Sequence, residues 1–441
     1  MQFISLIVLV LSMVSPIASG ASKFFSEDLN FSTSLANSEN SILVNERYQK
    51  ALQHPFYRRV RVATLEESPS ALKESSPRQL EAFYDLNLFP DVHLSVHFER
   101  PFAGPQGLQS WYGRVVGDPL SQVVVTLKDA MAVGEVSTKK GHYYFHAIGN
   151  QEMLIAEFDD SKMSTQGGDV LKVNLLKSVN GHQKKNVQKD SAATDGSVID
   201  LAVLYTADVA AADSSITTTI ANAVAWVNAA LDRSCTETSF RLVGTQQTTY
   251  SESGSMATDL TRLQKSGDGY LDEAYTLRST LGADIVHLWI ENLTEACGLA
   301  YVSQFESSVD SLYAFGVEMR ICGSRTFAHE LGHNMGSNHD RYQNQVDQGT
   351  NNYYGVGFGY VAPHSGNQDI MSYSTYCSDH GITCTQLSLY SNPRIFCSFM
   401  GVHSAKFCFH PHPLCRIFES SLRERLEDLS KNQKPLSPNV R

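Results

Sequence analysis

Residues 329–340 of the chain read HELGHNMGSNHD and place three histidines and a glutamate at spacings that suit one metal ion. Residues four apart lie on the same face of an α-helix, so His329 and His333 can point their imidazoles at the same ion. Gly336 then permits a sharp turn, because glycine tolerates the positive φ that ends helices. His339 arrives from another direction, and three imidazoles with an open fourth position are typical of a catalytic zinc site.

Glu330 lies beside the first ligand, where its carboxylate is poorly placed to bind the ion and well placed to take a proton from an activated water. The motif therefore predicts a hydrolytic reaction with Glu330 as general base. The alternative is a chance HExxH on an ordinary amphipathic helix, and Gly336 and His339 in register argue against it. Ser324 is the expected N-cap of this helix.

The stretch HELGHNMGSNHD resembles the extended zinc signature of the metzincin metallopeptidases, HExxHxxGxxH. An aspartate directly after the third histidine, here Asp340, is typical of the adamalysin or reprolysin branch, where it anchors the zinc-binding loop. The resemblance also implies a methionine turn beneath the metal. Residues 369–373, DIMSY, would supply it, with Met371 as packing rather than as a ligand.

The resemblance covers residues 197–393 and is nearest to the reprolysin-like peptidyl-Asp metalloendopeptidases. It is carried by IDLAVLYT at 199–206, CGLAY at 297–301 and YSNP at 390–393. It implies an α/β (α+β) metzincin catalytic domain with a mixed sheet and a zinc-binding helix, preceded by a β-rich propeptide domain. It also implies one Zn²⁺ ion and protein or peptide substrates.

Tyr373 stands two residues after the turn methionine. A tyrosine at this place resembles the astacins and serralysins, in which the phenol reaches the metal or the oxyanion. The resemblance thus implies a second catalytic residue. The alternative is a core tyrosine whose hydroxyl is hydrogen-bonded.

Residues 1–20 have the outline of a secretory signal peptide, with an apolar run over 3–14 and small residues at 18–20. The run is too short to span a bilayer, and no later stretch is long and apolar enough to do so, so we expect a secreted, extracellular protein without a membrane partner. An uncleaved anchor is the alternative. The net charge of −11 argues against a nucleic-acid partner. The oligomeric state is not indicated.

All the cysteines lie in the second half of the chain, and in an exported protein they indicate disulfides. The eight positions are 235, 297, 322, 377, 384, 397, 408 and 415. The sequence does not determine the connectivity, and we predict the pairs Cys297–Cys322 and Cys377–Cys384.

Residues 21–196 are expected to form a propeptide domain and a linker. Alternation at Leu94, Val96 and Phe98, alternation over 123–127 and the run 142–146 predict a β-rich fold, and WYGRV at 111–115 resembles a reprolysin-type propeptide. An independent binding domain is the alternative. The polar linker 177–196 should be open to proteases.

The catalytic domain is assigned to residues 197–395. We expect strands at 198–205, 240–250 and 284–290, and helices at 214–234, 256–265 and 270–281. The segment 297–303 should be the edge strand of the cleft, to which an extended peptide adds as a further strand. An interior strand is the alternative.

Residues 396–441 form a divergent tail that contains three cysteines and His403, His410 and His412. The sequence leaves three interpretations of this tail: a second metal site, structural disulfides, or a shifted reading frame in the gene model.

The chain is thus expected to be a secreted, zinc-dependent endopeptidase made as a precursor. The rival is a non-catalytic binding or toxin-like module on a metzincin scaffold. An acidic cleavage preference, which the peptidyl-Asp resemblance implies, needs a cation, and Arg320, Arg325, Arg394 and His364 are the candidates. Because no cysteine precedes Cys235, a propeptide thiol cannot occupy the zinc, and we expect activation by cleavage of the linker.

Overall fold

The computed structural model describes residues 22–26, 39–66, 83–103, 108–128, 131–150, 152–163, 170–171, 198–292, 294, 296–303, 310–344 and 357–392. The predicted signal peptide at 1–20, the linker at 177–196 and the tail at 396–441 lie outside these residues. Within them, no helix is long and apolar enough to cross a membrane.

The first half of the chain forms a nine-stranded sheet in the order β1-β3-β4-β5-β6-β7-β8-β9-β2. All its strand pairs are antiparallel except β1 with β3. We call it the N-terminal sheet. Its strands are β1 (Ser22–Lys23), β2 (Tyr57–Thr64), β3 (Phe83–Phe89), β4 (Val92–Ala103), β5 (Gln109–Val115), β6 (Gln122–Lys128), β7 (Met131–Ser137), β8 (His142–Ala147) and β9 (Glu152–Phe158); the helices α2 (Glu39–Leu52) and α4 (Asp160–Met163) accompany it.

The second half forms a mixed sheet, to which β10 of the N-terminal half adds one edge strand. The six strands lie in the order β10-β14-β15-β13-β11-β12, and we call this the catalytic sheet. Its central strand β13 is apolar except for His287 and fully buried, as expected for a parallel strand covered on both faces. Its strands are β10 (Val170–Leu171), β11 (Val198–Tyr205), β12 (Ser239–Gln247), β13 (Ile285–Ile290), β14 (Gly298–Tyr301) and β15 (Phe315–Met319), and its helices are α5 (Ala207–Ala212), α6 (Ile216–Arg233), α7 (Met256–Gln264), α8 (Glu273–Leu281) and α9 (Gly323–Asn334).

The remaining elements are short. A two-stranded sheet pairs β16 (Ser337–Asn338) with β17 (Gly357–Phe358). A three-stranded sheet joins β18 (Val361–Ala362), β19 (Asn367–Gln368) and β20 (Thr385–Gln386), next to α10 (Thr375–Asp379). Turns of 3₁₀ helix lie at Asp310–Tyr313, Arg320–Cys322 and Pro363–Ser365.

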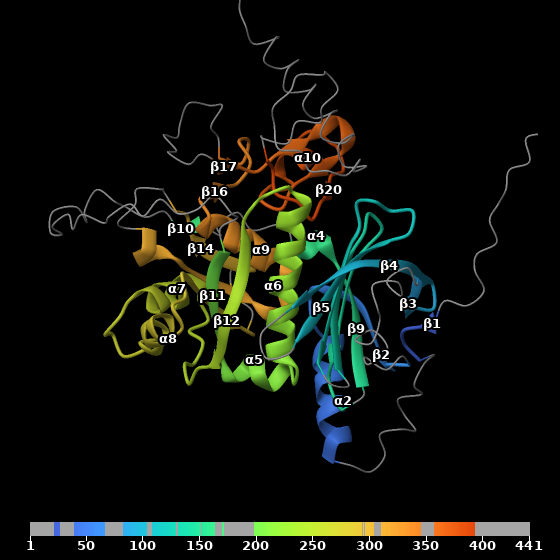
Figure 1. Cartoon of the computed structure of the whole chain (residues 1–441), viewed down its shortest axis with the longest axis horizontal. Coiled ribbons are helices and arrows are strands. Elements are labelled where there is room, and N and C mark those ends of the chain that lie inside the picture. The colour runs from blue at the N-terminus through green and yellow to red at the C-terminus, as the bar shows by residue number, and fades with distance from the viewer. Residues whose placement is uncertain are drawn as a thin grey trace, which may run out of the picture.

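Helix α6 lies between the two sheets, as Figure 1 shows. One face carries the apolar residues Ile220, Val227 and Leu231, which pack in a cluster with strands of the catalytic sheet. The helix also contacts the N-terminal sheet, where Asn222 is buried and its side chain accepts a hydrogen bond of 3.0 Å from Thr126. A helix enclosed in this way is buried around nearly its whole circumference.

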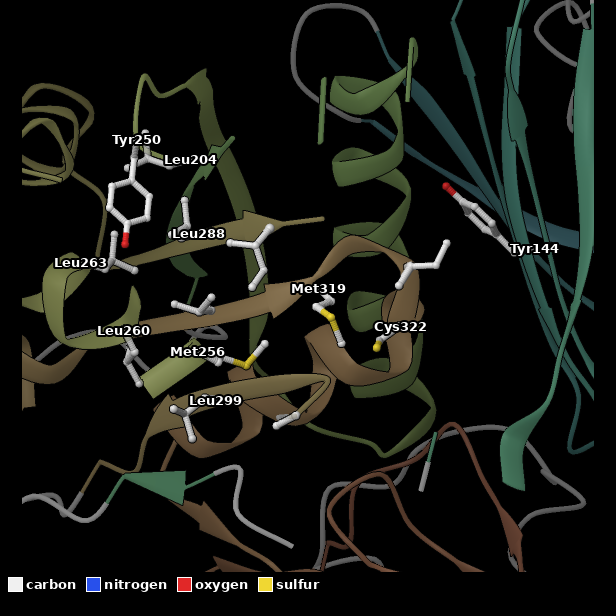
Figure 2. Packing of buried hydrophobic residues seen from close by; sticks show 14 of the residues in the cluster. Tyr144, Leu204, Tyr250, Met256, Leu260, Leu263, Leu288, Leu299, Met319 and Cys322 are labelled. Carbon is white, nitrogen blue, oxygen red and sulfur yellow. The ribbon is translucent and has the colours of Figure 1, made fainter. Parts of the chain in front are cut away.

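The two sheets therefore share their hydrophobic cores. One cluster unites Tyr144 and Phe158 of the N-terminal sheet with Met319 and Cys322 near the start of α9. In Figure 2, Tyr144 points from its strand toward the layer that contains Met319 and Cys322. The assignment of residues 21–196 to a propeptide domain remains a prediction.

The predicted disulfides Cys297–Cys322 and Cys377–Cys384 are both present in the structure. The predicted edge strand needs a correction, because β14 is not outermost. Strand β10 pairs with it in parallel, with Val170 opposite Ala300 and Leu171 opposite Tyr301. A segment more than a hundred residues earlier thus covers the edge that we expected to be open.

Candidate metal centre

The structure brings His329, His333 and His339 together. One ring nitrogen from each lies within 4.8 Å of the others, close enough for one ion to bind all three. His329 and His333 come from α9, one turn apart, and His339 follows the turn at Gly336, whose φ is +87°. The expected role of this glycine is confirmed, since other residues rarely adopt such a φ.

Backbone carbonyls orient two of the imidazoles. Nδ1 of His329 lies 2.8 Å from the carbonyl of Ile370, and Nδ1 of His333 lies 2.7 Å from the carbonyl of Ser337. A hydrogen bond from Nδ1–H leaves the lone pair on Nε2, which is the tautomer that binds a metal. Three neutral imidazoles with this outer support form a donor set that fits a divalent first-row metal ion.

Asp340 ties the loop after α9 to the methionine turn. Its carboxylate accepts hydrogen bonds from the backbone of Gln343 at 3.0 Å and of Tyr373 at 3.1 Å, and the side chain is buried. These contacts agree with the anchoring role that the sequence resemblance implies for Asp340. His339, the preceding residue, is thereby held in place.

Glu330 is 1% exposed and lies against strand β14. A Cβ added to Gly298 of that strand would come within 2.3 Å of Glu330 Oε1. A glycine at 298 is therefore required for the carboxylate to occupy this position beside the first histidine. We did not single out Gly298 from the sequence, because nothing local marks it as a neighbour of Glu330.

Met371 packs beneath α9, as the sequence predicts. It is buried, and a Cβ on Gly332 would meet its sulfur at 2.3 Å. Tyr373 lies beside the histidines, with ring centroids 4.5 Å from His339 and 5.9 Å from His329. The structure thus places Tyr373 at the centre, and its catalytic role remains a prediction.

The predicted N-cap of α9 was wrong. The helix begins at Gly323, Cys322 occupies the cap without a side-chain hydrogen bond, and Ser324 lies in the first turn. The backbone N–H of Ser324 instead donates to Glu135 of strand β7 at 3.0 Å. Glu135 is fully buried and lies 2.7 Å from His142 Nε2. A carboxylate at a helix N-terminus is favourable, and here the N-terminal sheet supplies it.

A cavity of about 480 Å³ lies next to the histidines. His329 and Glu330 line it together with residues of the segments 368–374 and 383–386. Phe158 of the N-terminal sheet and Lys140, in the turn between β7 and β8, also line it. The cavity therefore lies between the two halves of the chain.

Comparison with known proteins agrees with this geometry. The model of the reprolysin-type metallo-peptidase family M12 matches residues 195–384. Two proteins named peptidyl-Asp metalloendopeptidase, from Stenotrophomonas maltophilia strains R551-3 and K279a, are 30% and 29% identical to this chain, and each alignment covers 68% of this chain and 72% of the relative. Both alignments are longer than the family match, so the likeness includes residues outside it.

A solved structure of metalloproteinase-II from Bacteroides fragilis aligns with 59% of this chain and 82% of its own at 10% identity, and its TM-score of 0.38 is too low to support an argument. The motif, the converging histidines and the relative at 30% identity together show the family. The chain belongs to the metzincin-type metallopeptidases of family M12, metal-dependent hydrolases that act on peptides and proteins.

Proposed function

We propose that the protein is a secreted, zinc-dependent endopeptidase, made as a latent precursor, with Glu330 as general base. The observation that carries this proposal is the convergence of three histidine nitrogens within 4.8 Å beside a buried glutamate on a cavity wall. Three histidines with an open position are the donor set of catalytic zinc. Secretion is inferred from the signal-like residues 1–20.

Zinc at this centre would polarise the scissile carbonyl and acidify the attacking water. His329, His333 and His339 would hold it. Glu330 takes the proton from the water and passes it to the leaving amine, because its carboxylate lies beside His329 and on the cavity wall. Gly298 leaves the space in which this carboxylate sits.

The outer edge of β14 is the proposed binding site for the extended peptide substrate. A peptide that adds to a strand edge is held by backbone hydrogen bonds, while alternate side chains enter pockets. The relatives are named for peptidyl-Asp cleavage. We therefore propose that this protein also prefers an acidic residue just after the cut.

Latency is proposed because the N-terminal half occupies this same site. Strand β10 pairs with the outer edge of β14, and residues of the N-terminal sheet form one wall of the cavity. No cysteine precedes Cys235, so a thiol from this half cannot bind the metal. Activation should follow proteolysis within 177–196, which frees the N-terminal half to leave.

The proposed endopeptidase activity is tested by digestion of a protein substrate. The activated protein should digest casein, lose that activity with phenanthroline and regain it with added zinc. Glu330→Gln should abolish digestion while the protein still binds zinc, and Glu237→Gln, which alters an exposed acid between α6 and β12, should leave digestion unchanged. A zinc-loaded wild type that cleaves nothing would support the rival, a binding module on the same scaffold.

Latency is tested on the uncut precursor. An organomercurial should not activate it, whereas limited proteolysis within 177–196 should. Prompt activation by the organomercurial, with the linker intact by mass spectrometry, would contradict the proposed mechanism.

A further inference from the structure

Arg325 lies one helical turn before the first metal ligand. Because it precedes His329 by four residues on α9, both side chains project from the same face of the helix. Both also line the cavity of about 480 Å³, together with Glu330. Among the described cavity-lining residues that follow residue 197, Arg325 is the one lysine or arginine.

Gln386 holds the Arg325 guanidinium beside the catalytic centre. Its Oε1 accepts a hydrogen bond of 3.3 Å from Arg325 Nη1, and its Nε2 donates to the carbonyl of Ile370 at 3.2 Å. That carbonyl also accepts from His329 Nδ1. The same backbone oxygen therefore sets the orientation of both the metal ligand and the amide that holds the arginine.

Of the other cations considered from the sequence, the two that lie within the described residues do not line the cavity. Arg320 is buried and bound by Glu291 at 2.8 and 3.1 Å, and it is not part of the lining. His364 stands in a 3₁₀ turn and does not line the cavity either. Arg394 lies outside the described residues.

The guanidinium retains binding capacity on the cavity side. The Arg325 side chain is 13% exposed, and its Nε is buried with no hydrogen-bond partner among the described residues. Arginine binds a carboxylate best through two parallel N–H donors, and such charge-assisted bonds are about twice as strong as neutral ones. An incoming aspartate can supply the second partner that Nε lacks.

In the precursor, a carboxylate already contacts this arginine. Asp160, at the start of α4, places Oδ1 at 3.6 Å from Arg325 Nη1 and at 3.5 Å from His142 Nδ1. Burial raises the pKa of the Asp160 carboxyl, but Arg325 and His142 together hold it below its usual range. Asp160 is therefore an anion that already pairs with the guanidinium that an acidic substrate side chain would bind.

We propose that Arg325 is the specificity residue that binds an acidic substrate side chain beside the scissile bond, and that Asp160 occupies it in the precursor as a stand-in. The proposal rests on the endopeptidase function above. It assigns acid recognition to a residue of the metal-binding helix, so the same helix holds the metal and selects the side chain. Departure of the N-terminal half frees the arginine for the substrate.

The first test measures specificity in the activated enzyme. Three peptides that differ only by Asp, Asn or Lys after the cut are offered to wild type, Arg325→Gln, Arg325→Lys and Arg325→Glu. Wild type should favour Asp, and Arg325→Gln should lower that preference about 10- to 100-fold while it still cleaves the Asn peptide. Arg325→Lys should retain part of the preference, and Arg325→Glu should favour a Lys peptide.

The matched control is Arg241→Gln, which removes an exposed arginine of β12, the strand at the far edge of the catalytic sheet, where it pairs with Asp200 of β11. It should leave the Asp preference intact. An Arg325→Gln enzyme with the wild-type Asp preference, or a wild type that does not distinguish the Asp and Asn peptides, overturns the proposal.

A binding measurement separates this proposal from the endopeptidase function. Linker-cut Glu330→Gln protein, freed of its N-terminal half, should bind the labelled Asp peptide at least about 10-fold more tightly than the Asn peptide, and Arg325→Gln in that background should abolish the difference. This result would support the acidic site even if wild type cleaves nothing. Equal affinities for the two peptides would refute it even in an active enzyme.

The role of Asp160 is tested in the uncut Glu330→Gln precursor with the amide of N-acetyl-aspartic acid, a ligand too short to need the edge of β14 that β10 covers. Asp160→Asn should raise the affinity of the precursor for this ligand about two- to fivefold, as expected for the loss of one partly exposed ion pair. The control is Asp159→Asn, which removes an adjacent carboxylate that pairs with Lys162 rather than with Arg325. Unchanged affinity in Asp160→Asn would refute the stand-in role.

Discussion

The contact between Gly298 and Glu330 predicts the effect of a single added methyl group. In Gly298→Ala, the new Cβ would lie 2.3 Å from Oε1 and 2.7 Å from Cδ of Glu330, whereas ordinary contacts begin near 3.4 Å. The carboxylate must therefore move by about 1 Å, and a misplacement of this size can lower a rate about 100-fold. The side chain is flexible, so the fold should survive.

We expect kcat of the activated Gly298→Ala enzyme to fall about 100-fold with a small change in KM, because the general base is displaced while the peptide-binding edge of β14 remains. The assay is steady-state hydrolysis of a fluorogenic peptide, with zinc content measured in parallel. Gly244→Ala is the control. Gly244 lies on β12, the strand at the edge of the catalytic sheet farther from β14, and its new Cβ would meet the Leu281 side chain at 2.5 Å. It should lower stability and leave kcat unchanged. A Gly298→Ala enzyme with wild-type kcat and full zinc would refute the assignment of Glu330.

Further predictions concern the surroundings of the metal. Asp340→Ala leaves two backbone N–H groups without their acceptor and should weaken zinc binding about 10- to 100-fold, measured by competition with a chelator. Tyr373→Phe should lower kcat if the phenol acts on the substrate, and an unchanged turnover rate would exclude that role. Burial raises the pKa of Asp369 to about 6, above its ordinary value of 3.8, so the unfolded chain loses this proton first as the pH rises. The free energy of unfolding should therefore fall by about 2 kcal/mol between roughly pH 4 and 6, relative to Asp369→Asn, in urea titrations at both pH values.

Short-range features of this protein were predictable from its sequence. The spacing of His329 and His333 on one helical face, the turn at Gly336 and the strand Val198–Tyr205 all appear in the structure where the sequence placed them. Helix α7 at Met256–Gln264 agrees to within one residue. These features depend on periodicity and backbone conformation over a few residues, which the sequence contains directly.

The long-range contacts of these elements could be seen only in the tertiary structure. The N–H of Ser324 finds its acceptor in Glu135, 189 residues earlier, and Val170 pairs with Ala300 at the edge of β14. No local pattern encodes such pairings, because they form only when the two sheets pack against α6. Packing also distinguished Arg325 from Arg320, since two arginines five residues apart look equivalent in sequence. One is neutralised by Glu291 in the core and the other lines the cavity, and burial and partner choice are properties of the assembled fold.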